Sequence, residues 1–207
     1  METIFDSGTT RNPFNYQKIE QISRDVSTTW IPLTVVADQL NLYGDTSQDD
    51  LLYGLELAAR MSIEDHLGIS MFETGYRTYY GLTALNSPYT ALDLPQGDNI
   101  TVDAVKYWNS ANSLITISSS DYYLDASGSK IVVTAPPSDL NTSRTSPIYA
   151  EYTQGPSLLA AYPVVQQAGL LMLMHLYNNR SETHDKVLKR IPLGVDHLLR
   201  PYKELVL

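Results

Sequence analysis

Glu64, Asp65 and His66 stand side by side in the chain, and carboxylates beside an imidazole are common partners in proton transfer. The surrounding pattern is helical, however, and consecutive residues of a helix point in different directions, so these three cannot converge on one substrate atom. A solvated helix face with one partly buried histidine explains the triplet better. The other three histidines fall in other expected elements, and no pair has the spacing of a metal site on a helix.

The remaining sequence offers little for catalysis or cofactor binding. The oxygen-rich stretch "DTSQDD" at residues 45–50 lacks the glycine and the distal glutamate of a calcium loop, and helix capping accounts for it. A G-x-S-x-G elbow, a phosphate-binding glycine loop and a dinucleotide fingerprint are all missing from the sequence. We therefore expect no enzyme activity, no cofactor and no metal. One alternative is a hydrolase whose site is assembled from distant residues, with His66 or His175 meeting a carboxylate in a pocket.

The composition further limits the classes of protein to which the chain can belong. The 207 residues include 43% hydrophobic and only 18% charged residues, which is typical of a folded protein with much surface free for protein contacts. Fifteen tyrosines fit the same interpretation. The net charge of −9, without any basic run, argues against nucleic-acid binding, and the absence of cysteine excludes disulfides. The N-terminus lacks the basic start and apolar core of a signal peptide.

The first part of the chain predicts an arm followed by two helices. Residues 1–29 are polar, with only a weak helical tendency around residues 16–22. A short helix is expected next, with Thr34 as its N-cap and Gly44 as its stop. A longer helix follows, opened by a capping box of Ser47 and Asp50 and closed by Gly68.

A β-rich stretch then separates these helices from two more. Residues 71–154 form short β-branched and aromatic runs divided by turn residues, with "ASGS" at 126–129 as a hairpin turn. Helical spacing returns from Pro163 to about Asn179, and a last short helix, "VDHLLRPY", should end near Pro201. We therefore expect an α+β fold, in which a small helical bundle carries an inserted antiparallel β region. The expected division is an arm (1–29), a helical connector domain (30–70 and 155–207) and a β domain (71–154).

The helix "LLMLMHLYNNR", at residues 170–180, is apolar on nearly every side until Tyr177. The apolar run 164–177 is shorter than the roughly 20 residues that a bilayer span needs, and it contains glutamines and a histidine, so we expect a buried helix and no membrane contact. Such a helix must be covered all round, by its own chain or by a neighbouring subunit. The candidate core or interface residues are Leu170, Leu173, Met174, Leu176 and Tyr177.

In the order and spacing of these elements the chain resembles the head-tail connector (adaptor, or head completion) proteins of tailed bacteriophages, in particular the longer members with a β insertion. The similarity spans Pro32 to Lys203. The stretches that carry it are "PLTVVADQLNL", "DDLLYGLELAARMSIEDHLGISM", "LDLPQGDNITVDAVKYWN", "IYAEYTQG", "YPVVQQAGLLMLMHLYNNRSE" and "IPLGVDHLLRPYK". The lead-in of residues 1–29 is longer than usual for that family.

The resemblance implies a structural ring, a dodecamer, docked beneath the portal protein in the neck of the virion after assembly in the host cytoplasm. Downstream neck or tail proteins would bind it, and DNA would pass through without specific binding. Carboxylates that are neither core nor firmly paired are candidates to line such a channel, and the helix pattern gives Asp49, Asp50, Glu56 and Glu64. Capping and an ordinary solvated surface explain the same four residues equally well. A second alternative function is a β-rich phage tail or binding module.

Overall fold

Helices and antiparallel sheets segregate into two compact units in the computed structural model, which confirms the expected α+β class. The sheet unit contains described residues of 1–24 and 73–155, and the helical unit contains those of 25–72 and 156–207. The expected division into an arm (1–29), a helical connector domain (30–70 with 155–207) and a β domain (71–154) stays a prediction. The structure describes residues 16–81, 90–95, 99–127, 129–179 and 193–203.

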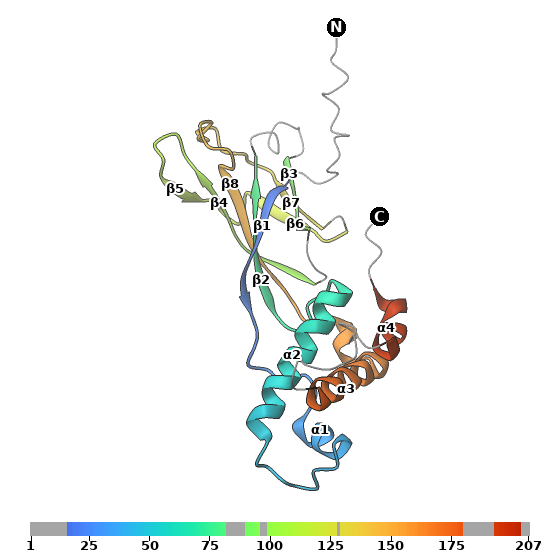
Figure 1. Ribbon diagram of the computed structural model, residues 1–207. Coiled ribbons are helices and arrows are strands. Elements are labelled where there is room, and N and C mark those ends of the chain that lie inside the picture. The colour runs from blue at the N-terminus through green and yellow to red at the C-terminus, as the bar shows by residue number, and fades with distance from the viewer. Residues whose placement is uncertain (1–15, 82–89, 96–98, 128, 180–192, 204–207) are drawn as a thin grey trace. The chain divides into compact units, whose positions relative to one another are not determined.

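The sheet unit holds two antiparallel sheets (Figure 1). A five-stranded sheet has the order β1-β2-β8-β4-β5, and a three-stranded sheet has the order β3-β7-β6. The expected hairpin across residues 126–129 is confirmed, since β6 and β7 pair from Asp125 and Lys130 onward. The strands are β1 (Tyr16–Arg24), β2 (Thr74–Tyr80), β3 (Thr90–Asp93), β4 (Ile100–Trp108), β5 (Leu114–Thr116), β6 (Tyr122–Asp125), β7 (Lys130–Val133) and β8 (Ile148–Gln154).

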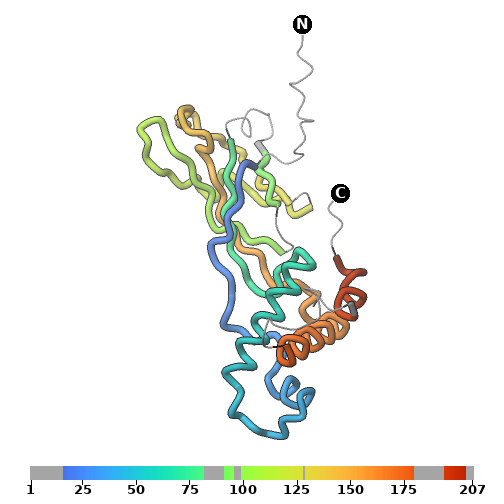
Figure 2. The backbone as a smooth tube through the Cα atoms, in the orientation of Figure 1, coloured from blue at the N-terminus to red at the C-terminus, as the bar shows by residue number. Residues whose placement is uncertain are grey.

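Strand β1 corrects the expectation of an arm with a weak helical tendency. Residues 16–24 pair along β2 as an edge strand, and the two run side by side in Figure 2. A register shift between Gln21 and Ser23 interrupts the alternation of the strand, so Ile19 and Ile22 are spaced as on a helix. An edge strand is also solvated enough to be polar. Residues 1–15, the rest of the expected arm, lie outside the described residues.

The core of the sheet unit takes side chains from both sheets. Tyr80, Ile148 and Tyr152 come from the larger sheet, and Leu92 and Ile131 from the smaller one, all almost fully buried. The Tyr80 hydroxyl donates a hydrogen bond to the Asp93 carbonyl at 2.8 Å, which satisfies its polar atom inside the core.

The helical unit contains α1 (Leu33–Gln39), α2 (Asp49–Leu67), the 3₁₀ turn η2 (Leu158–Ala161), α3 (Pro163–Asn178), α4 (Leu193–Leu199) and the 3₁₀ turn η3 (Arg200–Tyr202). Two expected boundaries are confirmed: Gly68 ends α2 with a left-handed φ of 75°, and Pro163 opens α3. The expected caps are wrong. Pro32 and Gln48 hold the N-cap positions of α1 and α2 without side-chain capping bonds, and α1 ends before Gly44 is reached.

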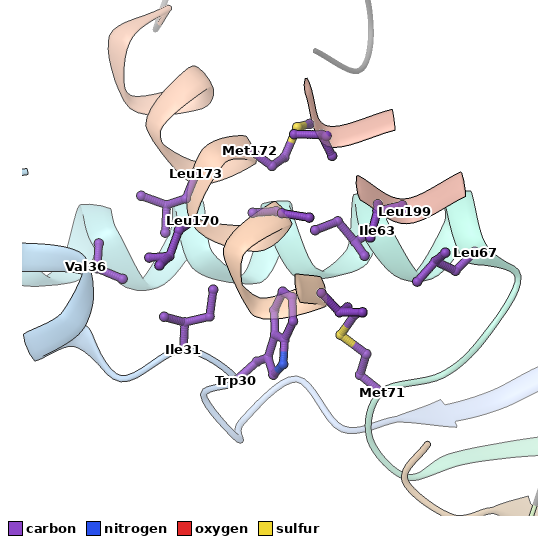
Figure 3. Close-up of a cluster of buried hydrophobic side chains, with 14 of the residues drawn as sticks. Trp30, Ile31, Val36, Ile63, Leu67, Met71, Leu170, Met172, Leu173 and Leu199 are labelled. Atoms are coloured by element: carbon purple, nitrogen blue, oxygen red, sulfur yellow. The ribbon is translucent and has the colours of Figure 1, made fainter. Parts of the chain in front are cut away.

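Helix α3 crosses α2 and also contacts α4, so it lies at the centre of the helical unit (Figures 1 and 3). Trp30 and Ile31 fill the space beside Gly169, where an added Cβ would lie 2.4 Å from the Trp30 ring. Glycine therefore allows α3 to pass this close to the tryptophan. The Trp30 indole N–H donates to the Ala160 carbonyl at 2.8 Å. Among the described residues, no helix combines the length and the apolar character that a membrane crossing requires.

Candidate interaction surfaces

Glu56 is buried, which corrects its assignment as a channel-lining residue. Its carboxylate accepts hydrogen bonds from the backbone N–H groups of Trp30 at 3.0 Å and Ile31 at 3.1 Å, and only 3% of the residue is exposed. Burial raises the pKa of Glu56, and these two N–H donors and the charge of Arg60 offset only part of that shift. Glu56 therefore fastens the segment before α1 to α2 and cannot face a channel.

Arg60 and Glu64 continue the same buried stripe along α2. Arg60, which is fully buried, donates to the carbonyl oxygens of Thr28 at 2.7 Å and Asp25 at 2.6 Å, and its guanidinium lies 4.8 Å from the Phe72 ring centre. Glu64, 2% exposed, accepts from the Met71 backbone N–H at 2.7 Å. The expectation that Glu64 lines a channel is thus also wrong. Its carboxyl group anchors the chain that leaves α2.

The other two candidate channel residues occupy the start of α2. Asp50 is exposed and Asp49 is half-buried, both in the first turn of the helix. Carboxylates there are stabilised by the positive end of the helix dipole. Asp50 is accessible to solvent. A channel-lining role for Asp49 and Asp50 stays a prediction.

Two of the histidines lie near other polar groups in the helical unit. The His66 Nε2 atom, on α2, lies 3.4 Å from the Asp196 carboxylate on α4, without the geometry of a hydrogen bond. The His175 Nδ1 atom lies 3.3 Å from the Asn179 side-chain amide at the end of α3. A histidine–carboxylate pair becomes catalytic only with a nucleophile or a held water on the imidazole. Within the described part of the chain, no group of three or more acidic or histidine side chains is placed to hold a metal.

The apolar residues of α3 are covered mainly by their own chain. Leu170 and Leu173 are buried in the helical core, and Leu176 and Tyr177 pack against it. Met174 is half-buried, and its sulfur accepts from the Gln39 side chain at 3.3 Å. A role for these five in an interface between subunits stays a prediction, because packing within one chain already accounts for their apolar character.

A ladder of charges crosses the sheet unit and was missed from the sequence. Glu20, Arg77 and Glu151 lie directly opposite one another on β1, β2 and β8. The Arg77 Nε atom donates to Glu151 at 2.9 Å, and the Lys106 ammonium lies 2.7 Å from the same carboxylate. Charged residues in the middle of aromatic strands were the available signal, because each needs a partner on a neighbouring strand.

The ladder holds its central carboxylate in the ionised form. Burial raises the pKa of Glu151, but the hydrogen bonds from Lys106 and Arg77 outweigh it, so the pKa lies below the ordinary value of 4.5. The same hydrogen bond raises the pKa of Lys106. A carboxyl group with a lowered folded-state pKa adds stability that is present above its unfolded pKa and is lost as the pH falls through the folded pKa.

Replacing Glu151 with Gln should therefore cost the sheet unit about 1–2 kcal/mol at pH 7, because it removes charge-assisted bonds to two cations. The difference from wild type should shrink as the pH falls below about 4, where the wild-type carboxylate protonates. Urea unfolding at pH 7 and pH 3 measures both quantities. Asp103→Asn, at an exposed carboxylate on β4, is the matched control and should change little. An equal loss at both pH values would contradict the ladder's role.

Two exposed apolar sets remain, at opposite ends of α3 in the helical unit. The C-terminal end of α3 adjoins α1 and the loop after it, since Tyr177 donates to the Gln48 side chain at 2.9 Å. The N-terminal end adjoins η3, since the Tyr162 and Tyr202 rings meet edge to face with centres 5.8 Å apart. The exposed apolar side chains at the first end are Val35, Tyr43, Leu51 and Tyr53, and those at the second are Leu158, Tyr162 and Val164.

Solved structures share this fold, although the sequence matches no protein-family profile and no curated protein. A chain from the virion of a native gene transfer agent (GTA) particle is 20% identical, with a TM-score of 0.59. A chain from the neck of an empty GTA particle computed with C6 symmetry is 20% identical, and one from the neck of a native GTA particle computed with C12 symmetry is 21% identical, both with a TM-score of 0.61. Each similarity covers 92% of this chain and 97% of the other. At such identity the likeness establishes a common fold.

Proposed function

We propose that the protein is a structural head-tail connector of a tailed bacteriophage or a phage-like particle. The observation that carries the proposal is the fold shared with chains of GTA necks over 92% of this chain and 97% of the other. A match of that extent includes both units. The resemblance of the sequence to phage connector proteins, which rests on different observations, supports the same role.

The connector would act as a ring of identical subunits, a dodecamer, between the portal protein and the neck or tail proteins below it. The similar chains belong to necks computed with C6 and C12 symmetry, in which identical subunits surround one axis. The protein would assemble in the host cytoplasm and remain in the neck of the virion. Its task would be mechanical, joining capsid to tail, with no catalytic step.

The acidic balance of the chain fits a channel through which DNA slides without being gripped. The net charge is −9, and a protein that holds DNA neutralises phosphates with clustered Lys and Arg. Of the four carboxylates expected to line the channel, Asp50 and Asp49 remain candidates after the burial of Glu56 and Glu64 is taken into account. Repulsion between carboxylates and phosphates acts over about 8 Å at physiological salt.

Particles assembled without the protein should consist of DNA-filled heads and free tails that fail to join, because the ring would be a required link between the portal and the neck or tail proteins below it. Electron microscopy of lysates from a nonsense mutant, with and without complementation in trans, measures the fraction of heads that are joined to tails. Without complementation this fraction should fall at least about tenfold, which is more than a modest change in the affinity between head and tail would cause. Complemented particles should show ring density at the neck. Normal joining without the protein, or its location at the distal tail, would favour the alternative of a β-rich tail or binding module.

A further inference from the structure

The end of the helical unit that carries α1 is acidic and exposes aromatic and aliphatic side chains. Residues 30–53 contain four aspartates and no lysine, arginine or glutamate. Asp38 and Asp45 are exposed beside Val35 and Tyr43, and Tyr43 itself is 89% exposed. The hydrogen bonds that Ser47 gives to Asp45 lower the pKa of this carboxyl group, so it is ionised at neutral pH. We call this surface the α1 end.

Tyr43 is held outward by an unusual backbone. It adopts a left-handed φ of 47°, between Asn41 at 57° and Gly44 at 85°. Bulky residues rarely occupy this region, and such conformations persist where the surroundings enforce them, often at functional sites. A large ring displayed in this way contributes nothing to the core of its own chain, but a tyrosine is well suited to bury itself in a partner.

The opposite end of the helical unit is apolar and basic. Leu158, in η2, is 82% exposed, and Tyr162 and Val164 at the start of α3 are exposed beside it. Arg200 and Lys203, in and directly after η3, are also exposed, and the Tyr162–Tyr202 ring contact brings η3 against this surface. Residues 156–167 contain no charged side chain. We call this surface the η3 end.

The two surfaces are complementary and distinct. One presents aspartates around a protruding ring, and the other presents cations around aliphatic side chains. They cap the two ends of α3, whose 16 residues span about 24 Å. The two surfaces of one chain are therefore too far apart to contact each other, whereas the α1 end of one copy is complementary to the η3 end of another. Contacts of this head-to-tail type build rings when the rotation between copies closes.

We propose that copies of this chain associate head to tail through the helical unit, with the α1 end of one copy against the η3 end of the next. The inference rests on the proposed function, because repeated head-to-tail contacts of this kind would produce the closed ring that the connector forms. It goes further by assigning the contacting residues, with Tyr43 and Leu158 as the apolar anchors and Asp38 and Asp45 facing Arg200 and Lys203. It also explains why Tyr162, which precedes α3, and Val164, in the first turn of α3, are left exposed in one chain.

Cysteine cross-linking tests the assignment, because the chain has no native cysteine. The full-length double variant Tyr43→Cys/Leu158→Cys, treated with a short bismaleimide at high protein concentration, should give a ladder of covalent oligomers. Each single variant should stay monomeric, and an equal mixture of the two single variants should yield dimers and nothing larger. The double variant Tyr43→Cys/Ala58→Cys, with its second cysteine on an exposed middle turn of α2, is the matched control and should give no ladder.

Charge reversal supplies the second readout. Asp38→Lys with Asp45→Lys, added to the cross-linking variant, should lower the ladder yield about tenfold at low salt and less at high salt, as expected for exposed charge pairs. Should Tyr43→Cys reduce the amount of folded protein, Asp45→Cys offers the same end of the unit.

Dimers from either single variant, or no ladder in any variant, would overturn the head-to-tail assignment. These outcomes would leave the proposed function in place if the protein is found as a ring in particle necks. If the double variant gave covalent oligomers but the protein were absent from particle necks, the proposed function would be contradicted instead.

Discussion

Replacing Leu173 with Asp should unfold the helical unit at room temperature. Leu173 is 1% exposed and lies among the buried side chains that α3 directs toward the rest of the core (Figure 3). Truncating a buried leucine costs about 2–5 kcal/mol, and an uncompensated carboxylate adds the cost of burying a charge. Domains of this size have a total stability of about 5–15 kcal/mol, so the substitution should consume most or all of it.

The two tryptophans make this result measurable unit by unit, because Trp30 lies in the helical core and Trp108 in the sheet unit. In a Trp108→Phe background, urea unfolding followed by fluorescence reports on the surroundings of Trp30. The control is Gln167→Asp, an exposed position on the same helix, which should change the stability by less than about 0.5 kcal/mol. A Leu173→Asp protein that melts like wild type would mean that this face of α3 is not buried.

Local signals predicted those elements whose boundaries are set within a few residues. Gly68 is the left-handed stop of α2, Pro163 is the first residue of α3, and β6 pairs with β7 from Asp125 and Lys130 onward. Each of these features depends on the conformational preference of one or two residues. The apolar character of α3 likewise predicted its burial in the core, because a helix without a polar face must be covered.

Features that depend on distant partners could not be predicted. Strand β1 exists because β2 lies beside it, and its register shift hides the alternation that would mark it as a strand. The order of the larger sheet places β8 between β2 and β4, a pairing that no local pattern encodes. Glu151 is stabilised only through this order, since its two cations belong to the two neighbouring strands.

The charged residues of α2 are the clearest case in which a local sequence pattern led to a wrong prediction. Glu56, Arg60 and Glu64 are four residues apart, which is the spacing of ion pairs on a solvated helix face. Their partners are instead backbone groups of segments that flank α2, at Trp30, Ile31 and Met71 among others. Spacing alone does not distinguish a helix face that meets water from one that meets unpaired N–H groups.

Replacing Glu56 with Ala should therefore destabilise the helical unit by about 2–4 kcal/mol, because it leaves the backbone N–H groups of Trp30 and Ile31 without an acceptor and removes the attraction between Glu56 and the buried Arg60. Asp50→Ala, at the exposed start of the same helix, loses only a dipole contribution of about 0.3–1 kcal/mol. Urea unfolding of the two variants in the Trp108→Phe background measures this contrast. If Glu56→Ala and Asp50→Ala lost similarly little stability, Glu56 would have to be a surface residue.

Glu56→Gln separates the hydrogen bonds from the charge. The amide keeps an acceptor oxygen, so this variant should lose less stability than Glu56→Ala. Burial raises the pKa of Glu56 above its ordinary value of 4.5, and a raised folded-state pKa gives stability that is present below the unfolded pKa and is lost as the pH rises through the folded pKa. The advantage of wild type over Glu56→Gln should therefore shrink as the pH rises from about 4 to 7. If it grew instead, the ionised carboxylate would be the form that the folded protein prefers, and the amides of Trp30 and Ile31 would outweigh the cost of its burial.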